Sequence, residues 1–123
     1  ISYLLSHKNK GKGGKSLFPS WIMEDKIPEY DSRLAWCYGD LGVGISLLHA
    51  SNILKSQSLE AESWNILEQT SNRKDIKNTE VLDAAICHGS FGNAQIYKRL
   101  VQKKTNPLFR LLFAKKFVEI FEF

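Results

Sequence analysis

A chain of 123 residues is long enough for one domain with one hydrophobic core. Its 43% hydrophobic and 24% charged residues exclude an intrinsically disordered chain, and no apolar run reaches the ~18 residues of a transmembrane helix. The net charge of +4 includes a lysine cluster within 8–15. No aromatic residue lies among these lysines to stack on bases, so we expect no nucleic-acid partner.

The first segment, Ile1–Ser6, has neither a starting methionine nor a basic leader nor a cleavage site, so we expect a piece of a longer protein without a secretory signal. Glycines and prolines interrupt residues 1–31. We predict that this stretch is a loop excursion within the domain, with an extended or short-strand segment at 17–23.

Residues 32–123 carry helical periodicity, which predicts an all-α fold for this part of the domain. Apolar residues recur at steps of three and four over 41–54, as on one face of a helix. A second helix is predicted with Ser58 as its N-cap, and it ends in the polar stretch 70–74.

Three further helices are predicted toward the C-terminus. Thr79 is expected to cap a helix over 81–86, and the next helix covers about 91–101. The last begins at Pro107 and is apolar nearly all round. Such a helix requires partners on two sides, so we expect self-association through it. The aromatic residues expected in the core are Trp36 and Trp64, whereas Trp21 is interpreted as a loop anchor.

A weak internal repeat underlies the helical part. Cys37-Tyr38-Gly39-Asp40-Leu41-Gly42 aligns with Cys87-His88-Gly89-Ser90-Phe91-Gly92, about 50 residues later, and a helical pattern follows each copy. This period is typical of helical hairpin repeats, each with one inner and one outer helix. The repeat predicts that both cysteines lie at the same level of the fold, where they can share one metal ion.

The metal-ligating candidates are Cys37, Cys87 and His88. Two thiols and an imidazole are the three protein ligands of a catalytic zinc whose fourth position stays open. Buried cysteines also occur as small hydrophobic residues, which is the alternative for Cys37. A structural zinc would require a fourth protein ligand, for which only His7 and His49 are available. Otherwise His49 is expected to be a surface or hydrogen-bonded histidine.

The segment from Ser32 to Asp40, followed at this distance by Cys87-His88-Gly89, resembles the lanthionine synthetase C-like family, the lantibiotic cyclases. The resemblance implies a fragment of an α/α toroid of inner and outer helices, with zinc at the mouth of the inner ring. It implies that Cys37, Cys87 and His88 are the zinc ligands, and that Arg33 and Tyr38 are catalytic residues. For Arg33 the alternative is an ion pair with Asp31, Asp40 or Glu29, and for Tyr38 it is packing.

The implied activity is the addition of a peptide cysteine thiolate to dehydroalanine or dehydrobutyrine, which forms the thioether rings of lantibiotics. The implied partners are a dehydrated precursor peptide, a dehydratase and a transporter. The implied location is the cytoplasm, peripheral to the membrane within a biosynthetic complex, where thiols stay reduced. The family's upstream histidine motif and aspartate do not occur in these residues. The alternative function is a zinc-stabilised module that binds a peptide or glutathione without turnover.

Overall fold

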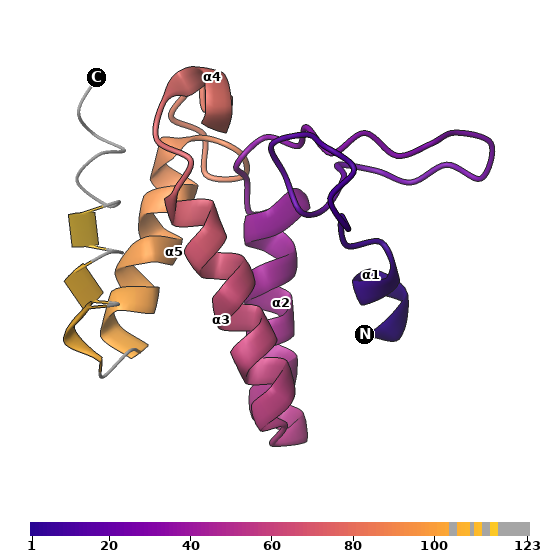
Figure 1. Ribbon diagram of the computed structural model, residues 1–123. Coiled ribbons are helices and arrows are strands. Elements are labelled where there is room, and N and C mark those ends of the chain that lie inside the picture. Colours follow the sequence, from indigo (N-terminus) through magenta and orange to yellow (C-terminus); the bar gives the residue numbers. More distant parts are fainter. Residues whose placement is uncertain (104–105, 109, 112–113, 116–123) are drawn as a thin grey trace.

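The computed structural model describes residues 1–103, 106–108, 110–111 and 114–115. These residues form helices and no strand, which confirms the predicted all-α class (Figure 1). In chain order the helices are α1 (Ser2–Ser6), α2 (Gly39–Leu54), α3 (Gln57–Ser71), α4 (Ile76–Thr79) and α5 (Ser90–Lys103). None of the helices in the described part of the chain combines the length and hydrophobicity needed to cross a bilayer. Most of the helix predicted after Pro107, and with it the surface expected to self-associate, falls outside the described residues.

Helices α2 and α3 form an antiparallel hairpin (Figure 1). The two helices approach closely at Gly44, because a Cβ there would lie 2.8 Å from Leu67 Cδ2. Helix α3 begins at a different serine from the one predicted: Ser56 is the N-cap, and its side chain accepts a hydrogen bond from Leu59 N at 3.3 Å. Ser58 lies inside the first turn instead.

The helix predicted over 81–86 does not form. Thr79 is the last residue of the short helix α4, which Asp75 caps, and Glu80 follows in the left-handed conformation (φ 55°). Residues 80–89 then run as an irregular loop and turn to the start of α5. The apolar residues that suggested a helix, Leu82 and Ile86, are 69% and 71% exposed, so no core burial supports a helix here.

The N-terminal stretch 1–31 is irregular apart from α1, which the sequence did not predict. Residues 17–23 form no strand, and the segment around residues 19–29 projects from the body of the molecule (Figure 1). Trp21 on this projection is half exposed.

The core lies where α2, α3 and α5 meet. It contains Leu41, Leu48, Trp64, Leu67, Tyr97 and Leu100 together with Leu34 and Val81. Helix α5 is also held by polar contacts: Tyr97 Oη donates to Thr70 Oγ1 (2.9 Å), and Asn93 Nδ2 donates to Leu34 O (2.7 Å). Of the two tryptophans predicted in the core, Trp64 is buried, but Trp36 is 49% exposed because it lies at the rim beside Cys37.

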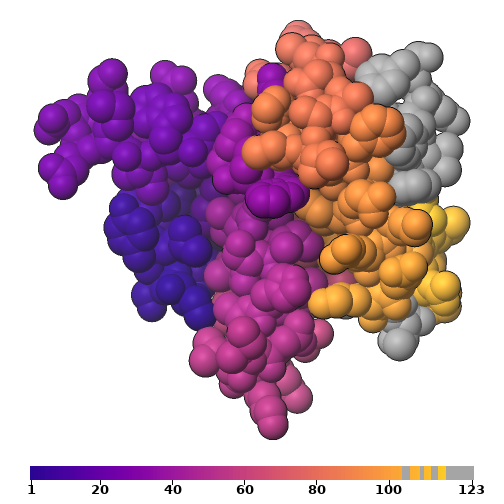
Figure 2. All heavy atoms as spheres, turned by 180° about the vertical axis from the view of Figure 1, so that it is seen from behind, coloured from indigo at the N-terminus to yellow at the C-terminus, as the bar shows by residue number. Residues whose placement is uncertain are grey.

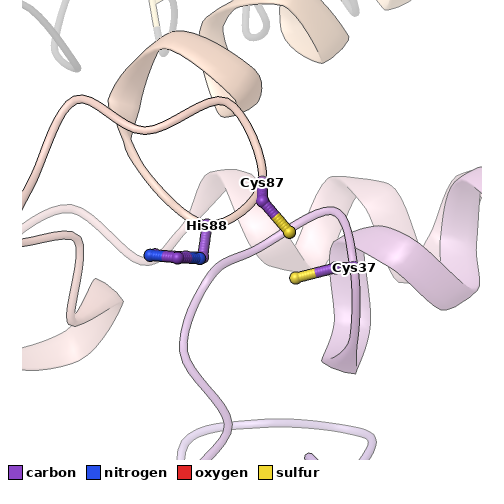
Figure 3. A group of neighbouring side chains, drawn as sticks. All are labelled: Cys37, Cys87 and His88. Carbon is purple, nitrogen blue, oxygen red and sulfur yellow. The ribbon is translucent and has the colours of Figure 1, made fainter.

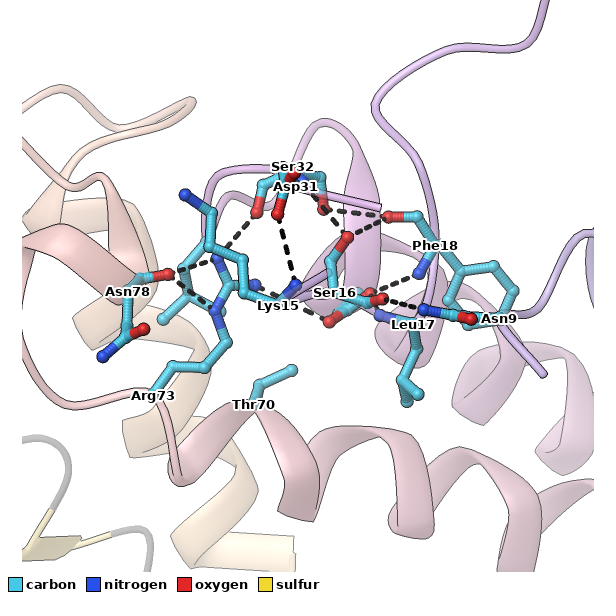
Figure 4. A network of polar contacts seen from close by, with 12 residues as sticks. Asn9, Lys15, Ser16, Leu17, Phe18, Asp31, Ser32, Thr70, Arg73 and Asn78 are labelled. Atoms are coloured by element: carbon cyan, nitrogen blue, oxygen red, sulfur yellow. Dashed lines mark hydrogen bonds and ion pairs between the residues drawn. The ribbon is translucent and has the colours of Figure 1, made fainter. Parts of the chain in front are cut away.

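A buried polar network joins the N-terminal stretch to the helices (Figure 4). Asp40, in the first turn of α2, accepts hydrogen bonds from Leu17 N (2.8 Å) and Phe18 N (2.7 Å). Its other oxygen pairs with Arg73 at 3.6 Å. Arg73 in turn donates to Ser32 O (2.6 Å) and Asn78 O (2.7 Å). This network holds the segment that leads into the first cysteine motif against α2.

Candidate metal centre

Both cysteines lie immediately before the N-terminus of a helix. Cys37 precedes α2 and Cys87 precedes α5, and the two helices begin at the same end of the molecule (Figure 1). The predicted repeat is therefore present as a structural repeat at this end, and it places the two thiols at the same level.

The second glycine of each motif has the same structural role. A Cβ on Gly42 would overlap Trp36 O, and a Cβ on Gly92 would overlap Ile86 O. In each copy the helix backbone thus packs directly against the residue before the cysteine. Only glycine permits this close approach, which explains why the Cys-x-Gly-x-x-Gly pattern appears twice.

The structure brings Cys37, Cys87 and His88 together (Figure 3). One ligand atom from each residue lies within 4.8 Å of the others. In a tetrahedral zinc site two thiolate sulfurs are about 3.8 Å apart. Both cysteines are exposed and His88 is only half-buried, so the three side chains lie at the surface, where a metal ion can reach them. The donor set therefore fits zinc with one position left for an exogenous ligand.

Two thiolates and one neutral imidazole also match zinc in charge. Together with Zn²⁺ they form a neutral centre, which can accept a further thiolate. The alternative of a structural zinc is not supported, because neither His7 nor His49 belongs to this group among the described residues. The alternative of buried cysteines is wrong for both positions, since both thiols are exposed.

Electrostatics at the centre act in both directions on Cys37. Partial desolvation raises the pKa of the Cys37 thiol, and the neighbouring Cys87 thiol raises it further. The positive charge of Arg33 lowers it, as does a backbone hydrogen bond. The family resemblance places Arg33 in the active site. In the structure, Arg33 is close enough to lower the pKa of the Cys37 thiol.

Arg33 forms an ion pair, but not with any of the three acids expected from sequence. Its Nη1 lies 3.7 Å from Asp83 Oδ2, and the same oxygen lies 3.5 Å from His88 Nε2. Sequence reasoning missed Asp83, because a single acid in the predicted 81–86 helix carried no signal. Its position four residues before Cys87 is the only hint that the sequence offers.

Tyr38 is the N-cap residue of α2, in an extended conformation (φ −163°), and its side chain is half-buried. Within the described part of the chain its hydroxyl group forms no hydrogen bond. His49 is exposed on α2, in agreement with the prediction of a surface histidine.

A groove of about 790 Å³ runs between α2 and α5 and reaches Cys37. Its walls include Trp36, Ile45 and His49 on one side and Ile96, Arg99 and Lys103 on the other. Figure 2 shows α2 (magenta) and α5 (orange) side by side on this face of the molecule. The groove combines apolar walls with cationic side chains.

Comparison with known proteins gives one clear result. The family model described as lanthionine synthetase C-like protein matches residues 1–123. No curated protein and no solved structure matches the chain significantly. Because the match covers every residue of the sequence, this chain belongs to the lanthionine synthetase C-like family.

Proposed function

We propose that this chain is part of a zinc-dependent cyclase that forms lanthionine-type thioether rings in a dehydrated peptide. The observation that carries the proposal is the convergence of Cys37, Cys87 and His88 at one exposed end of the fold, in a member of this family. The exposed position of both thiols favours a centre that receives a substrate over one that only stabilises the fold.

Cys37, Cys87 and His88 would hold the zinc ion. When bound, zinc lowers the pKa of a substrate thiol, so that a thiolate is present at neutral pH. In the reaction the peptide sulfur forms a bond to Cβ of a dehydroalanine or dehydrobutyrine, and the C=C double bond opens. The resulting enolate then takes up a proton at Cα, so that the thiol has been added across the double bond without loss of atoms.

Arg33 and Tyr38 are the residues of this chain that we assign to catalysis. Arg33 is close enough to lower the pKa of Cys37, and its guanidinium stabilises the negative charge that develops on the enolate oxygen. Tyr38 directly follows Cys37, and we propose that its hydroxyl group orients the reacting peptide. The groove that begins at Cys37 supports a peptide substrate, because it continues past the centre between two helices.

The first test combines zinc content with thioether formation. The 123-residue chain and the variants Cys37→Ala, Cys87→Ala and His88→Ala are dialysed, and zinc is quantified. Each protein is then incubated with a peptide that carries one cysteine and one dehydroalanine. Because cyclisation does not change mass, product is detected as the fraction of peptide that no longer reacts with N-ethylmaleimide. His7→Ala, a histidine at the end of α1 that belongs to neither the centre nor the groove, is the matched control for His88→Ala.

We expect one zinc per wild-type chain and per His7→Ala chain, and loss of zinc in the other three variants. Thioether formation is expected only in the proteins that retain zinc. Zinc binding and peptide binding without thioether formation would favour the alternative, a module that binds a peptide or glutathione without turnover. A wild-type chain without zinc would overturn the proposal.

A further inference from the structure

The carboxylate of Asp83 joins two parts of the candidate centre. Its Oδ2 lies 3.5 Å from His88 Nε2 and 3.7 Å from Arg33 Nη1. One residue thus contacts both a candidate metal ligand and the arginine that lies about 50 positions earlier in the chain. Neither contact could be predicted from the Cys-His-Gly motif, because the motif includes neither Asp83 nor Arg33.

The second carboxylate oxygen fixes Asp83 within its own turn. Asp83 Oδ1 accepts a hydrogen bond from Ala85 N at 2.8 Å. The backbone carbonyl of Asp83 accepts from Ser90 N at 2.9 Å, at the start of α5. A Cβ on Gly89 would overlap both Ala85 N and Asp83 Oδ1, so the glycine after His88 leaves room for this carboxylate. Asp83 is therefore held in place, although it is exposed.

The position of Asp83 determines which nitrogen of His88 faces the metal. Figure 3 shows the His88 ring with one nitrogen on the side of the cysteines and the other pointing away. Because Nε2 is the nitrogen that lies next to Asp83, Nδ1 is left for the metal. A carboxylate that receives the proton-bearing nitrogen fixes the tautomer and the orientation of a ligating imidazole.

We propose that Asp83 is a positioning residue, which orients His88 Nδ1 toward the metal and holds the Arg33 guanidinium beside the centre. This inference rests on the proposed function, in that the centre must bind zinc. Because the same oxygen pairs with Arg33, it also keeps the guanidinium beside the centre, where it can receive a developing negative charge. Asp83 acts through His88 and Arg33, so we assign it a positioning role and not a catalytic one.

The test is the zinc affinity of Asp83→Asn in the 123-residue chain. The amide oxygen can still accept from Ala85 N, but the amide NH₂ donates to His88 Nε2 and thereby favours the proton on Nδ1, the wrong tautomer for binding. We expect zinc affinity to fall by about 10- to 100-fold in competition with a chromogenic chelator. The thiolate-to-metal charge-transfer absorption of the cobalt-substituted protein is also expected to change, since the imidazole ligand is displaced.

The matched control is Asp25→Asn, which removes the same charge from an exposed loop position. Its zinc affinity is expected to equal that of the wild type. Thermal unfolding of the metal-free proteins separates positioning from folding, because Asp83→Asn is expected to unfold at the wild-type temperature. If that variant does not fold, Asp83→Ser keeps a short acceptor for Ala85 N without the charge and is measured in the same way.

The outcomes separate the two proposals. If the wild-type chain binds zinc and Asp83→Asn binds it equally tightly, the role of Asp83 is wrong while the proposed function stands. A lower metal-free unfolding temperature that accounts for the whole loss of affinity would assign Asp83 to the fold instead. If the wild-type chain itself binds no zinc, the proposed function fails, and the role of Asp83 fails with it.

Discussion

Two arginine–aspartate pairs of nearly equal length stand in opposite environments. Arg73 and Asp40 are 3.6 Å apart, and their side chains are 7% and 3% exposed. Arg33 and Asp83 are 3.7 Å apart, with side chains 23% and 43% exposed. The first pair lies under the N-terminal stretch, and the second lies at the candidate metal centre. An arginine–aspartate ion pair therefore occurs once in the buried interior and once at the exposed candidate centre.

The buried pair holds the fold. Burial raises the pKa of Asp40 and lowers the pKa of Arg73, while the charge of each partner acts in the opposite direction. Each member also bonds backbone groups. Asp40 accepts from Leu17 N and Phe18 N, and Arg73 donates to Ser32 O and Asn78 O, which Figure 4 shows around Arg73. At the exposed pair, solvent competes for both charges, so the pair contributes little to the stability of the fold. The fold therefore depends on the buried pair far more than on the exposed one.

The largest expected effect comes from breaking the buried pair. Arg73→Met leaves Asp40 buried without its cation and leaves Ser32 O and Asn78 O without their donor. Removing one member of such a pair costs about 3–5 kcal/mol. Urea unfolding followed by tryptophan fluorescence measures the loss in the free energy of unfolding. A loss below about 1 kcal/mol would contradict the structural role of this network.

The matched change at the exposed pair is Arg33→Met. We expect the free energy of unfolding to fall by at most about 1 kcal/mol, since exposed ion pairs contribute little. The pKa of Cys37 should rise, because Arg33 lowers it in the wild type. To measure this pKa, Cys37 is made the only cysteine by the change Cys87→Ser. The rate at which iodoacetamide alkylates the metal-free protein is then measured against pH, with and without Arg33→Met. An unchanged alkylation profile would show that Arg33 does not act on the thiol.

The smallest effect is expected at an acid that has only local partners. Asp75 caps α4, and hydrogen bonds from the Asn78 backbone and side chain lower its pKa. Because the pKa is lower in the folded state than the usual 3.8, Asp75 contributes stability above that value. This contribution is lost as the pH falls through the lowered pKa. The wild type should therefore unfold at a slightly higher temperature than Asp75→Ala at pH 7, and the difference should shrink as the pH is lowered below 3.8.

Local sequence signals predicted the helices that have one apolar face or a capping side chain. The apolar spacing over 41–54 and 91–101 corresponds to α2 and α5, and a serine cap precedes α3 as expected, although at Ser56. The same reasoning failed at 80–89, where Thr79 as a cap and the apolar residues after it suggested a helix over 81–86. There the hydrogen bonds of Asp83 to Ala85 N and Ser90 N stabilise an irregular turn instead.

The sequence by itself determined the helical class and pointed to the three candidate metal ligands. Cys37, Cys87 and His88 were found through a motif whose glycines allow each helix to pack against the residue before its cysteine, which is a local requirement. Only the tertiary structure decided which acid pairs with which arginine. Asp40 was a candidate partner for Arg33, but it forms its ion pair with Arg73. The partner of Arg33 is Asp83, which lies in the turn before α5. Ion pairs between distant residues depend on how the loops pack. Loop packing produces no periodic sequence pattern, so these pairs could not be predicted from the sequence.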